Sequence, residues 1–187
     1  MSFNFGDGST QTTASGVLEK IWVPCDGRTV STKSGNNMSI TNVTTEQSFA
    51  GTNYYDCTGS SLVYTPPTGT TLVIYEYAFQ TCRWDAHGIA HFKFQIDSTV
   101  ITNSYFDLSM NALLEDICHF KFPINIGGST NYDTGQLASW GSSRTLVLRG
   151  RRYGGSNEQR IHKTEYSDGS GTQRFHQPCV GVTAIAA

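Results

Sequence analysis

Hydrophobic and polar residues alternate strictly in two segments of nearly identical sequence. Residues 91–96 read HFKFQI, and residues 119–124 read HFKFPI. Successive side chains of a strand point to opposite faces, so the Phe and Ile positions of each copy share one face and the His and Lys positions share the other. The pattern predicts two half-buried strands with an aromatic inner face. We expect both strands in the same sheet, with His91 and His119 at equivalent places on its polar face.

Comparable patterns predict strands along most of the chain. The strongest is residues 71–79, where Val, Tyr, Tyr and Phe at alternate positions share one face. Clusters of Pro and Gly end the strands, because Pro lacks an amide donor and Gly adopts turn conformations freely. The other predicted strands cover residues 17–24, 60–65, 99–106, 137–140, 144–153, 159–166 and 180–186, and residues 108–116 are expected to form one or two helical turns. About eight strands in the main region, joined by short turns, predict an all-β fold, an antiparallel jelly-roll sandwich.

The chain divides into two predicted parts. Residues 1–47 are expected to form an N-terminal arm and a small β unit with a hairpin tip at residues 34–37, and residues 48–187 to form the jelly-roll domain. Residues 1–16 are rich in Gly, Ser and Thr and contain Phe3 and Phe5. A segment of this composition buries little apolar surface by itself, so we expect a partner to order it.

Composition narrows the range of partners. The chain has 187 residues with 13 basic and 15 acidic side chains, and this near balance gives little attraction to nucleic acid or to an anionic membrane. No apolar run is long enough to span a membrane, and the first residues lack the features of a secretory signal. The five Cys include no C-x-x-C pair, so we expect buried free thiols and assembly in a reducing compartment. We therefore expect neither a nucleic-acid nor a membrane partner.

No sequence motif of catalysis accompanies the strands. The chain contains no G-x-S-x-G elbow, no phosphate-binding Gly-rich loop and no H-E-x-x-H pair. Neighbouring carboxylates such as Glu115 and Asp116 are typical of a solvated surface. We expect no enzymatic activity, no catalytic residue, no cofactor and no metal ligand.

Two groups of polar residues are candidates for an interface. The polar face of the repeated strands carries His91, Lys93, His119 and Lys121. This face is either solvated or, if an oligomer covers it, a proton-sensitive contact. The second group is Arg149 and Arg151, which alternation directs to one face of a basic segment. Salt bridges within or between subunits are favoured there over a phosphate clamp, because the total charge is slightly acidic and no nucleic-acid-binding module is present.

Several segments together resemble one protein family. They are residues 23–27, 58–70, 73–77, 91–93, 125–128, 152–154, 156–158 and 182–185. From residue 17 onward the chain resembles a family of structural proteins of marine tailed bacteriophages. The resemblance implies a jelly roll similar to the trimeric tumour-necrosis-factor and C1q type, which phages use as capsid decoration and as fibre heads. It implies no particular functional residue.

The resemblance implies a virion structural protein, and we expect a capsid decoration or cement protein. Such a protein binds the major capsid protein, lies on the capsid surface of the virion and is assembled in the host cytoplasm. We expect a homotrimer, because the polar faces of the repeated strands and the aromatic face of residues 71–79 give more semi-apolar surface than one core needs. The expected interface residues are Phe3, Phe5, Trp22, His91, Lys93, His119, Lys121, Arg149 and Arg151.

Two alternatives stay open. The first is a tail- or head-fibre module that recognises a glycan of the host surface through exposed aromatic residues such as Trp84, Tyr132 or Trp140. The second is a carbohydrate-active enzyme, which requires two paired carboxylates in a cleft lined by aromatic residues. The sequence favours the fibre module over the enzyme, because it shows no such pair.

Overall fold

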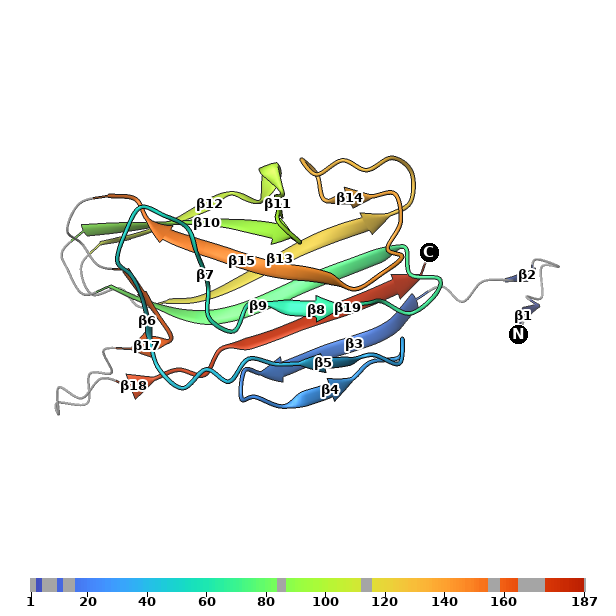
Figure 1. Ribbon diagram of the computed structural model, residues 1–187, viewed down its shortest axis with the longest axis horizontal. Helices are drawn as coiled ribbons and strands as arrows, with labels where there is room; N and C mark the ends of the chain where they lie inside the picture. The colour runs from blue at the N-terminus through green and yellow to red at the C-terminus, as the bar shows by residue number, and fades with distance from the viewer. Residues whose placement is uncertain are drawn as a thin grey trace.

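The computed structural model is almost entirely β-structure, arranged as a sandwich of two large sheets (Figure 1). It describes residues 3–4, 10–11, 16–83, 87–111, 116–154, 159–164 and 174–186. Within these ranges, no helix is long and apolar enough to cross a membrane. Of the aromatic residues considered above, Phe5 and Trp84 lie outside the described residues, and Phe3 is described only as backbone.

One large sheet has seven strands. They are β3 (Gly16–Pro24), β6 (Gln47–Phe49), β9 (Leu72–Arg83), β13 (Asp116–Ile126), β14 (Gln136–Leu137), β16 (Gln159–Ile161) and β19 (Cys179–Ala186). The centre of this sheet runs β3, β19, β9, β13, with every neighbouring pair antiparallel. Beyond the end of β19, β16 pairs with the last residues of β9.

The other large sheet has six strands. They are β7 (Tyr55–Asp56), β8 (Leu62–Tyr64), β10 (His87–Ile96), β11 (Thr99–Val100), β12 (Phe106–Asn111) and β15 (Arg144–Arg152). A short 3-10 helix, η1 (Thr102–Ser104), joins β11 to β12. Three pairs of short strands complete the chain: β1 (Phe3–Asn4) with β2 (Thr10–Gln11), β4 (Thr29–Ser31) with β5 (Asn37–Ser39), and β17 (Lys163–Thr164) with β18 (Arg174–Phe175).

The strand pairing follows the order of a jelly roll. Eight strands, taken in chain order, are β3, β8, β9, β10, β12, β13, β15 and β19. The first pairs with the eighth, the second with the seventh, the third with the sixth and the fourth with the fifth. This nesting is the double-sheet arrangement of a jelly roll, and the predicted fold class is confirmed.

The two repeated segments form strands as predicted, but they lie in opposite sheets. The first belongs to β10 and the second to β13. The expectation that they share a sheet is wrong. Each sheet contributes an apolar inner face to the core, so the same alternation suits one strand in each sheet, and the two inner faces pack against each other. Phe94 of β10 lies 5.7 Å from Phe120 and 5.4 Å from Phe122 of β13, measured between ring centres. His91 and His119 therefore lie on opposite outer surfaces.

The aromatic face of β9 is the centre of the core. The side chains of Val73, Tyr75, Tyr77 and Phe79 are all fully buried, as the alternation predicts. The hydroxyl groups of the two tyrosines donate hydrogen bonds to backbone carbonyls at Ser60 and Thr58. This face is fully buried within one subunit, so it offers no exposed surface to a trimer, contrary to the expectation from the sequence.

Residues 108–111 are extended, although a helical turn was predicted from residue 108. β12 extends to Asn111 and pairs with β10, with Leu108 opposite Ala90. The apolar residues Phe106, Leu108 and Met110 recur with a period of two, which favours a strand over a helix. Residues 112–115 lie outside the described residues.

Four cysteines have described side chains, Cys25, Cys57, Cys118 and Cys179, and all four are free thiols. Cys25 and Cys57 are buried, and the other two are half-buried. Burial raises the pKa of Cys25 to about 12 and that of Cys118 to about 11. These thiols are therefore protonated at neutral pH. Cys25 and Cys57 belong to the core and Cys118 packs on it, as expected, whereas Cys179 is half-buried outside the core and the side chain of Cys82 lies outside the described residues.

One histidine, His162, is fully buried beside the aromatic core. Its Nε2 lies 3.0 Å from the carbonyl oxygen of Thr58 and 3.4 Å from the hydroxyl group of Tyr77. Burial lowers the pKa of His162 to about 4, with a further contribution from His176. The backbone of His162 has φ of 70°, a left-handed conformation that Asn also tolerates.

The neutral state of His162 makes the fold sensitive to acid. An unfolded His titrates near 6.5 and the folded one near 4, so the unfolded chain binds the extra proton between these values. This stability is complete above about pH 6.5 and is lost as the pH falls toward 4, by about 3 kcal/mol in all. We expect His162→Asn to flatten the loss between pH 6.5 and 4 in urea unfolding. An unchanged slope in the variant would contradict this assignment.

Candidate functional site

The described residues predicted for an interface separate into two groups on opposite surfaces. His91, Lys93, Arg149 and Arg151 lie on the outer face of the six-stranded sheet. Trp22, His119 and Lys121 lie on the outer face of the seven-stranded sheet. This separation follows from the placement of β10 and β13 in different sheets.

The basic group on the six-stranded sheet surrounds a tyrosine. Lys93 and Arg149 are directly opposite each other on β10 and β15. The next pair on the same outer face is His91 with Arg151. The ring of Tyr54 lies among them, 4.1 Å from the Lys93 ammonium and 5.0 Å from the Arg151 guanidinium. Burial and the two arginines lower the pKa of Lys93. The cluster is thus partly desolvated by the chain's own residues.

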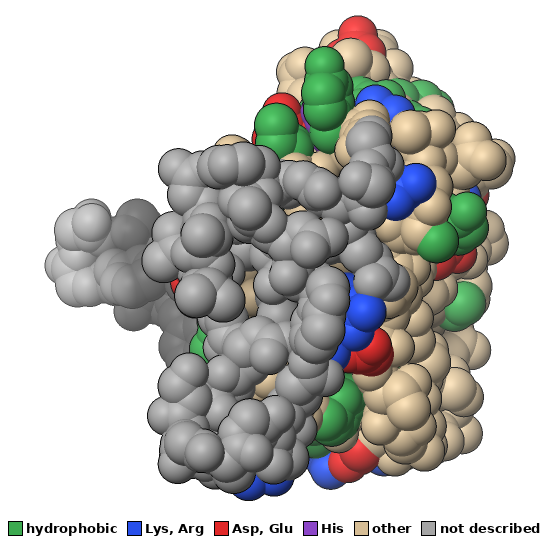
Figure 2. Space-filling model, turned by 90° about the vertical axis from the view of Figure 1, so that its left-hand side faces the viewer, with side chains coloured by type: hydrophobic (Ala, Val, Ile, Leu, Met, Phe, Trp, Pro, Cys, Tyr) green, Lys and Arg blue, Asp and Glu red, His purple; other side chains and the backbone are tan. Residues whose placement is uncertain are grey.

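Further contacts fasten this cluster to the segment before β8. Arg149 forms an ion pair with Asp56 at 2.8 Å and donates a hydrogen bond to the carbonyl oxygen of Tyr54. Arg151 donates a hydrogen bond to the carbonyl oxygen of Thr52. Figure 2 views one end of the molecule, where some of the Lys and Arg side chains touch Asp or Glu side chains. The basic cluster therefore binds residues 52–56 of the same chain, which agrees with the preference for salt bridges over a phosphate site.

His91 belongs to the same surface but makes separate contacts. Its Nδ1 lies 2.8 Å from a carboxylate oxygen of Asp107 on β12. Its ring stacks on Tyr153, with ring centres 5.2 Å apart. Tyr153 itself is largely exposed, so this end of the sheet presents an aromatic side chain to solvent.

The outer face of the seven-stranded sheet joins three predicted residues around one carboxylate. Glu76 on β9 forms an ion pair with Lys121 at 2.6 Å, and His119 Nε2 lies 3.6 Å from the same oxygen. The ring of Trp22 lies 5.3 Å from that of His119, although two strands separate β3 from β13. The indole reaches across β19 at the level of Gly181, which has no side chain to obstruct it.

This face also carries apolar side chains, with the polar residues Lys20, Gln80, Asn125 and Thr183 among them. Outward positions around the Glu76 carboxylate carry Leu72, Ile74, Ala78, Ile117, Pro123 and Ile185. Ile117 is 55% exposed and Trp22 is 39% exposed, whereas side chains of this kind are ordinarily removed from water. We call this surface, from β3 across β19 and β9 to β13, the Trp22 face.

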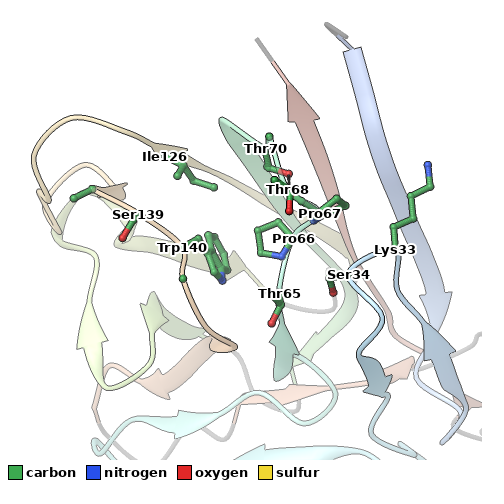
Figure 3. Close-up of a pocket in the computed structure, with 13 residues that line it drawn as sticks. Lys33, Ser34, Thr65, Pro66, Pro67, Thr68, Thr70, Ile126, Ser139 and Trp140 are labelled. Atoms are coloured by element: carbon green, nitrogen blue, oxygen red, sulfur yellow. Dashed lines mark hydrogen bonds between the residues drawn. The ribbon is translucent and has the colours of Figure 1, made fainter. Parts of the chain in front are cut away.

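A cavity of about 570 Å³ lies at one end of the sandwich. It is formed by three segments that are distant in sequence: the turn between β4 and β5, the β8–β9 loop, and the loop between β14 and β15, with Ile126 at the end of β13 (Figure 3). Its lining residues are Lys33, Ser34, Thr65, Pro66, Pro67, Thr68, Gly69, Thr70, Ile126, Ala138, Ser139, Trp140 and Gly141.

Sequence reasoning named Trp140 as an exposed aromatic but did not find this cavity. The indole is half-buried at its wall, and Tyr132, named with it, packs on the hydrophobic core. The Pro-Pro-Thr-Gly turn was predicted from the sequence, but residues 137–140 were predicted as a strand, whereas β14 ends at Leu137 and a loop follows. Only the jelly-roll topology brings them together, so no local pattern could have revealed it.

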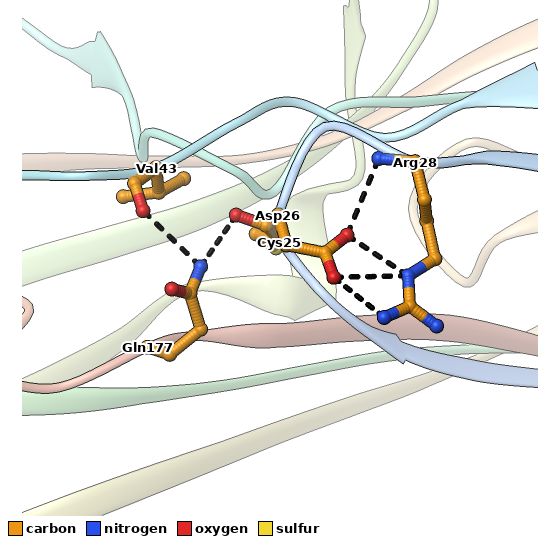
Figure 4. Close-up of polar contacts among 5 residues, drawn as sticks. All are labelled: Cys25, Asp26, Arg28, Val43 and Gln177. Atoms are coloured by element: carbon orange, nitrogen blue, oxygen red, sulfur yellow. Dashed lines mark hydrogen bonds and ion pairs between the residues drawn. The ribbon is translucent and has the colours of Figure 1, made fainter.

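A polar network attaches the chain after β3 to the sandwich (Figure 4). The side-chain amide of Gln177, just before β19, donates hydrogen bonds to the carbonyl oxygens of Cys25 and Val43. Asp26 accepts hydrogen bonds from Arg28 beside it, and these lower the pKa of the carboxyl group. β3 itself pairs with β19 along its length, so part of the predicted N-terminal unit belongs to the main sheet.

No group of three or more His, Cys, Asp or Glu in the described part of the chain is placed to hold a metal ion. No protein-family model matches the chain, and no curated protein matches it. The functional conclusion therefore depends on the surfaces described above and on the sequence resemblance.

Proposed function

We propose that the protein is a virion structural protein, a homotrimer that decorates a phage capsid and binds its major capsid protein. The Trp22 face is the single observation that carries the trimer. An exposed Trp beside half-exposed aliphatic side chains is typical of the centre of a protein interface. The jelly-roll order and the resemblance to marine phage structural proteins support the virion assignment.

The Trp22 face has the composition that a subunit contact needs. Burial of its apolar residues is favourable, and a second chain can cover the area of Trp22 and Ile117 that the described residues leave exposed. The Glu76 carboxylate is already paired with Lys121, so covering it leaves no unpaired charge. Closed three-fold symmetry uses this one surface three times and matches the local three-fold points of a capsid shell.

Attachment to the shell is assigned to the N-terminal arm. Residues 1–16 carry Phe3 and Phe5 in a Gly-, Ser- and Thr-rich segment, which suits a segment that is ordered by its partner. The arm joins the sandwich at the start of β3, an element of the Trp22 face. In this proposal the sheet face forms the trimer and the arm supplies the contact with the major capsid protein.

The trimer is tested with the full chain by size-exclusion chromatography with light scattering. We expect a mass about three times the 20.5 kDa of one chain at micromolar concentration. Trp22→Ala should weaken association by about 30-fold or more, which corresponds to a loss of about 2 kcal/mol at an interface hot spot. Tyr105→Ala is the matched control, because Tyr105 is 52% exposed at the six-stranded sheet and should leave the mass unchanged.

Either of two results would contradict the proposal. The first is a wild-type protein that stays monomeric at these concentrations. The second is a Trp22→Ala protein that is folded, by its circular dichroism, and as trimeric as the wild type.

A further inference from the structure

The cavity beside Trp140 has the shape and chemistry of a binding site that the trimer does not use. At about 570 Å³ it falls within the usual range for small-molecule sites. It lies at the end of the sandwich where β3 begins and β19 ends (Figure 1). Thr71, next to the lining residue Thr70, donates a backbone hydrogen bond to the carbonyl oxygen of Ile185 near the end of β19. The site is therefore at the margin of the Trp22 face and not within it.

Trp140 is held in one orientation, and its half-buried ring lines the cavity. Its Nε1 donates a hydrogen bond of 3.2 Å to the carbonyl oxygen of Tyr64, and the two rings meet edge to face at 6.2 Å. The indole N–H is thus already satisfied, and what remains is an apolar, electron-rich surface. Pro66 lies close to it in Figure 3. Such a surface stacks on the weakly positive C–H groups of a sugar ring.

Hydroxyl groups line the same cavity as the indole. Ser34, Thr65, Thr68 and Ser139 line the cavity, and each hydroxyl both donates and accepts hydrogen bonds. The side chains of Thr68 and Ser139 make no hydrogen bond within the described residues, and both residues are exposed. An apolar platform edged by free hydroxyl groups suits a ligand with one C–H face and a rim of hydroxyl groups.

Charge plays little part in the cavity. Lys33 is the one ionisable side chain among its described lining residues. The Lys33 ammonium donates a hydrogen bond to the carbonyl oxygen of Leu18 on β3, and Figure 3 shows it directed away from Trp140 and Pro66. The cavity therefore offers no fixed charge to a carboxylate or a phosphate group.

We propose that the Trp140 cavity binds a neutral saccharide, with one pyranose ring stacked on the indole and its hydroxyl groups on Thr68 and Ser139. This site does not depend on the trimer or on capsid decoration. The site is compatible with either role of the chain, a fibre head that recognises a host glycan or a decoration protein with a lectin-like site.

The test uses the full chain and a panel of neutral mono- and disaccharides of hexoses and N-acetylhexosamines, with saturation-transfer NMR and then titration of tryptophan fluorescence. We expect saturable binding of at least one member. Trp140→Ala should weaken it at least about tenfold, the loss of one aromatic contact, whereas Trp140→Phe should retain part of it. Thr68→Ala and Ser139→Ala, both at exposed positions, should weaken binding without changing the thermal unfolding midpoint. Tyr105→Ala should bind as the wild type does.

Three outcomes would overturn the proposal. They are no binding of any panel member at millimolar concentration, equal binding by the wild type and by folded Trp140→Ala, and binding confined to sialylated or sulfated sugars in a parallel panel. Because the oligomeric state is measured separately, a trimer without saccharide binding rejects only this site.

Discussion

Phe94→Ala should lower the free energy of unfolding by about 3–5 kcal/mol, since it removes a fully buried ring and leaves a cavity. The ring lies between the two sheets, 4.8 Å from Tyr75 and within 6 Å of two further Phe rings of β13, measured between ring centres. These neighbours are large and belong to rigid strands, so they cannot close around the missing ring. The loss is measured as a lower midpoint of urea unfolding with an unchanged m-value.

Lys93→Ala is the matched control, one residue away on the same strand. Its ammonium contacts the Tyr54 ring on the outer surface, so removing it should cost no more than about 1 kcal/mol. If the two variants lost equal stability, the inner and outer faces assigned to β10 would be wrong.

Gly181→Ala should be the most damaging change of a single methyl group, at about 3 kcal/mol or more. A Cβ at this position would collide with the carbonyl oxygen of Ile21 and lie 3.0 Å from the Cα of Trp22. Both obstacles are backbone atoms of β3, so β3 must move away from β19 to make room. The movement would also displace the Trp22 indole from its place over the sheet, and we expect association to weaken along with stability.

Gly141→Ala provides the comparison for this change. No atom lies within 4 Å of a Cβ built there, and its backbone is not left-handed, so the free energy of unfolding should stay within about 0.5 kcal/mol of the wild type. The measurement is thermal unfolding by circular dichroism of both variants. A Gly181→Ala protein as stable as Gly141→Ala would show that β3 and β19 are not as close as described.

The repeated segments show how far sequence alone leads. Period-two alternation placed Phe92, Phe94 and Ile96 on the buried side of their strand, and the structure confirms all three. The same pattern is silent on which sheet a strand joins, because the inner faces of both sheets require identical alternation. That is why His91 and His119 were expected together and lie apart. As a result, the residues predicted for one interface lie on two surfaces: the basic cluster on the six-stranded sheet and the Trp22 face on the seven-stranded sheet.

The candidate sites were less accessible from sequence than the fold. Trp22 was predicted at an interface, but its position beside His119 depends on the side-by-side order of four strands that no local pattern encodes. The cavity is a similar case, because Lys33 and Trp140 come from turns far apart in the chain. Local chemistry identified the residues, whereas the nested pairing of the jelly roll determined which of them meet.

The most direct test of the central claim is a cryo-electron microscopy reconstruction of the phage particle of which we propose this chain to be a part. We predict three copies of the jelly roll around local three-fold points of the capsid shell, with the Trp22 faces toward one another and the N-terminal arms on the major capsid protein. A shell without this density, or single copies confined to a tail or fibre, would contradict the account.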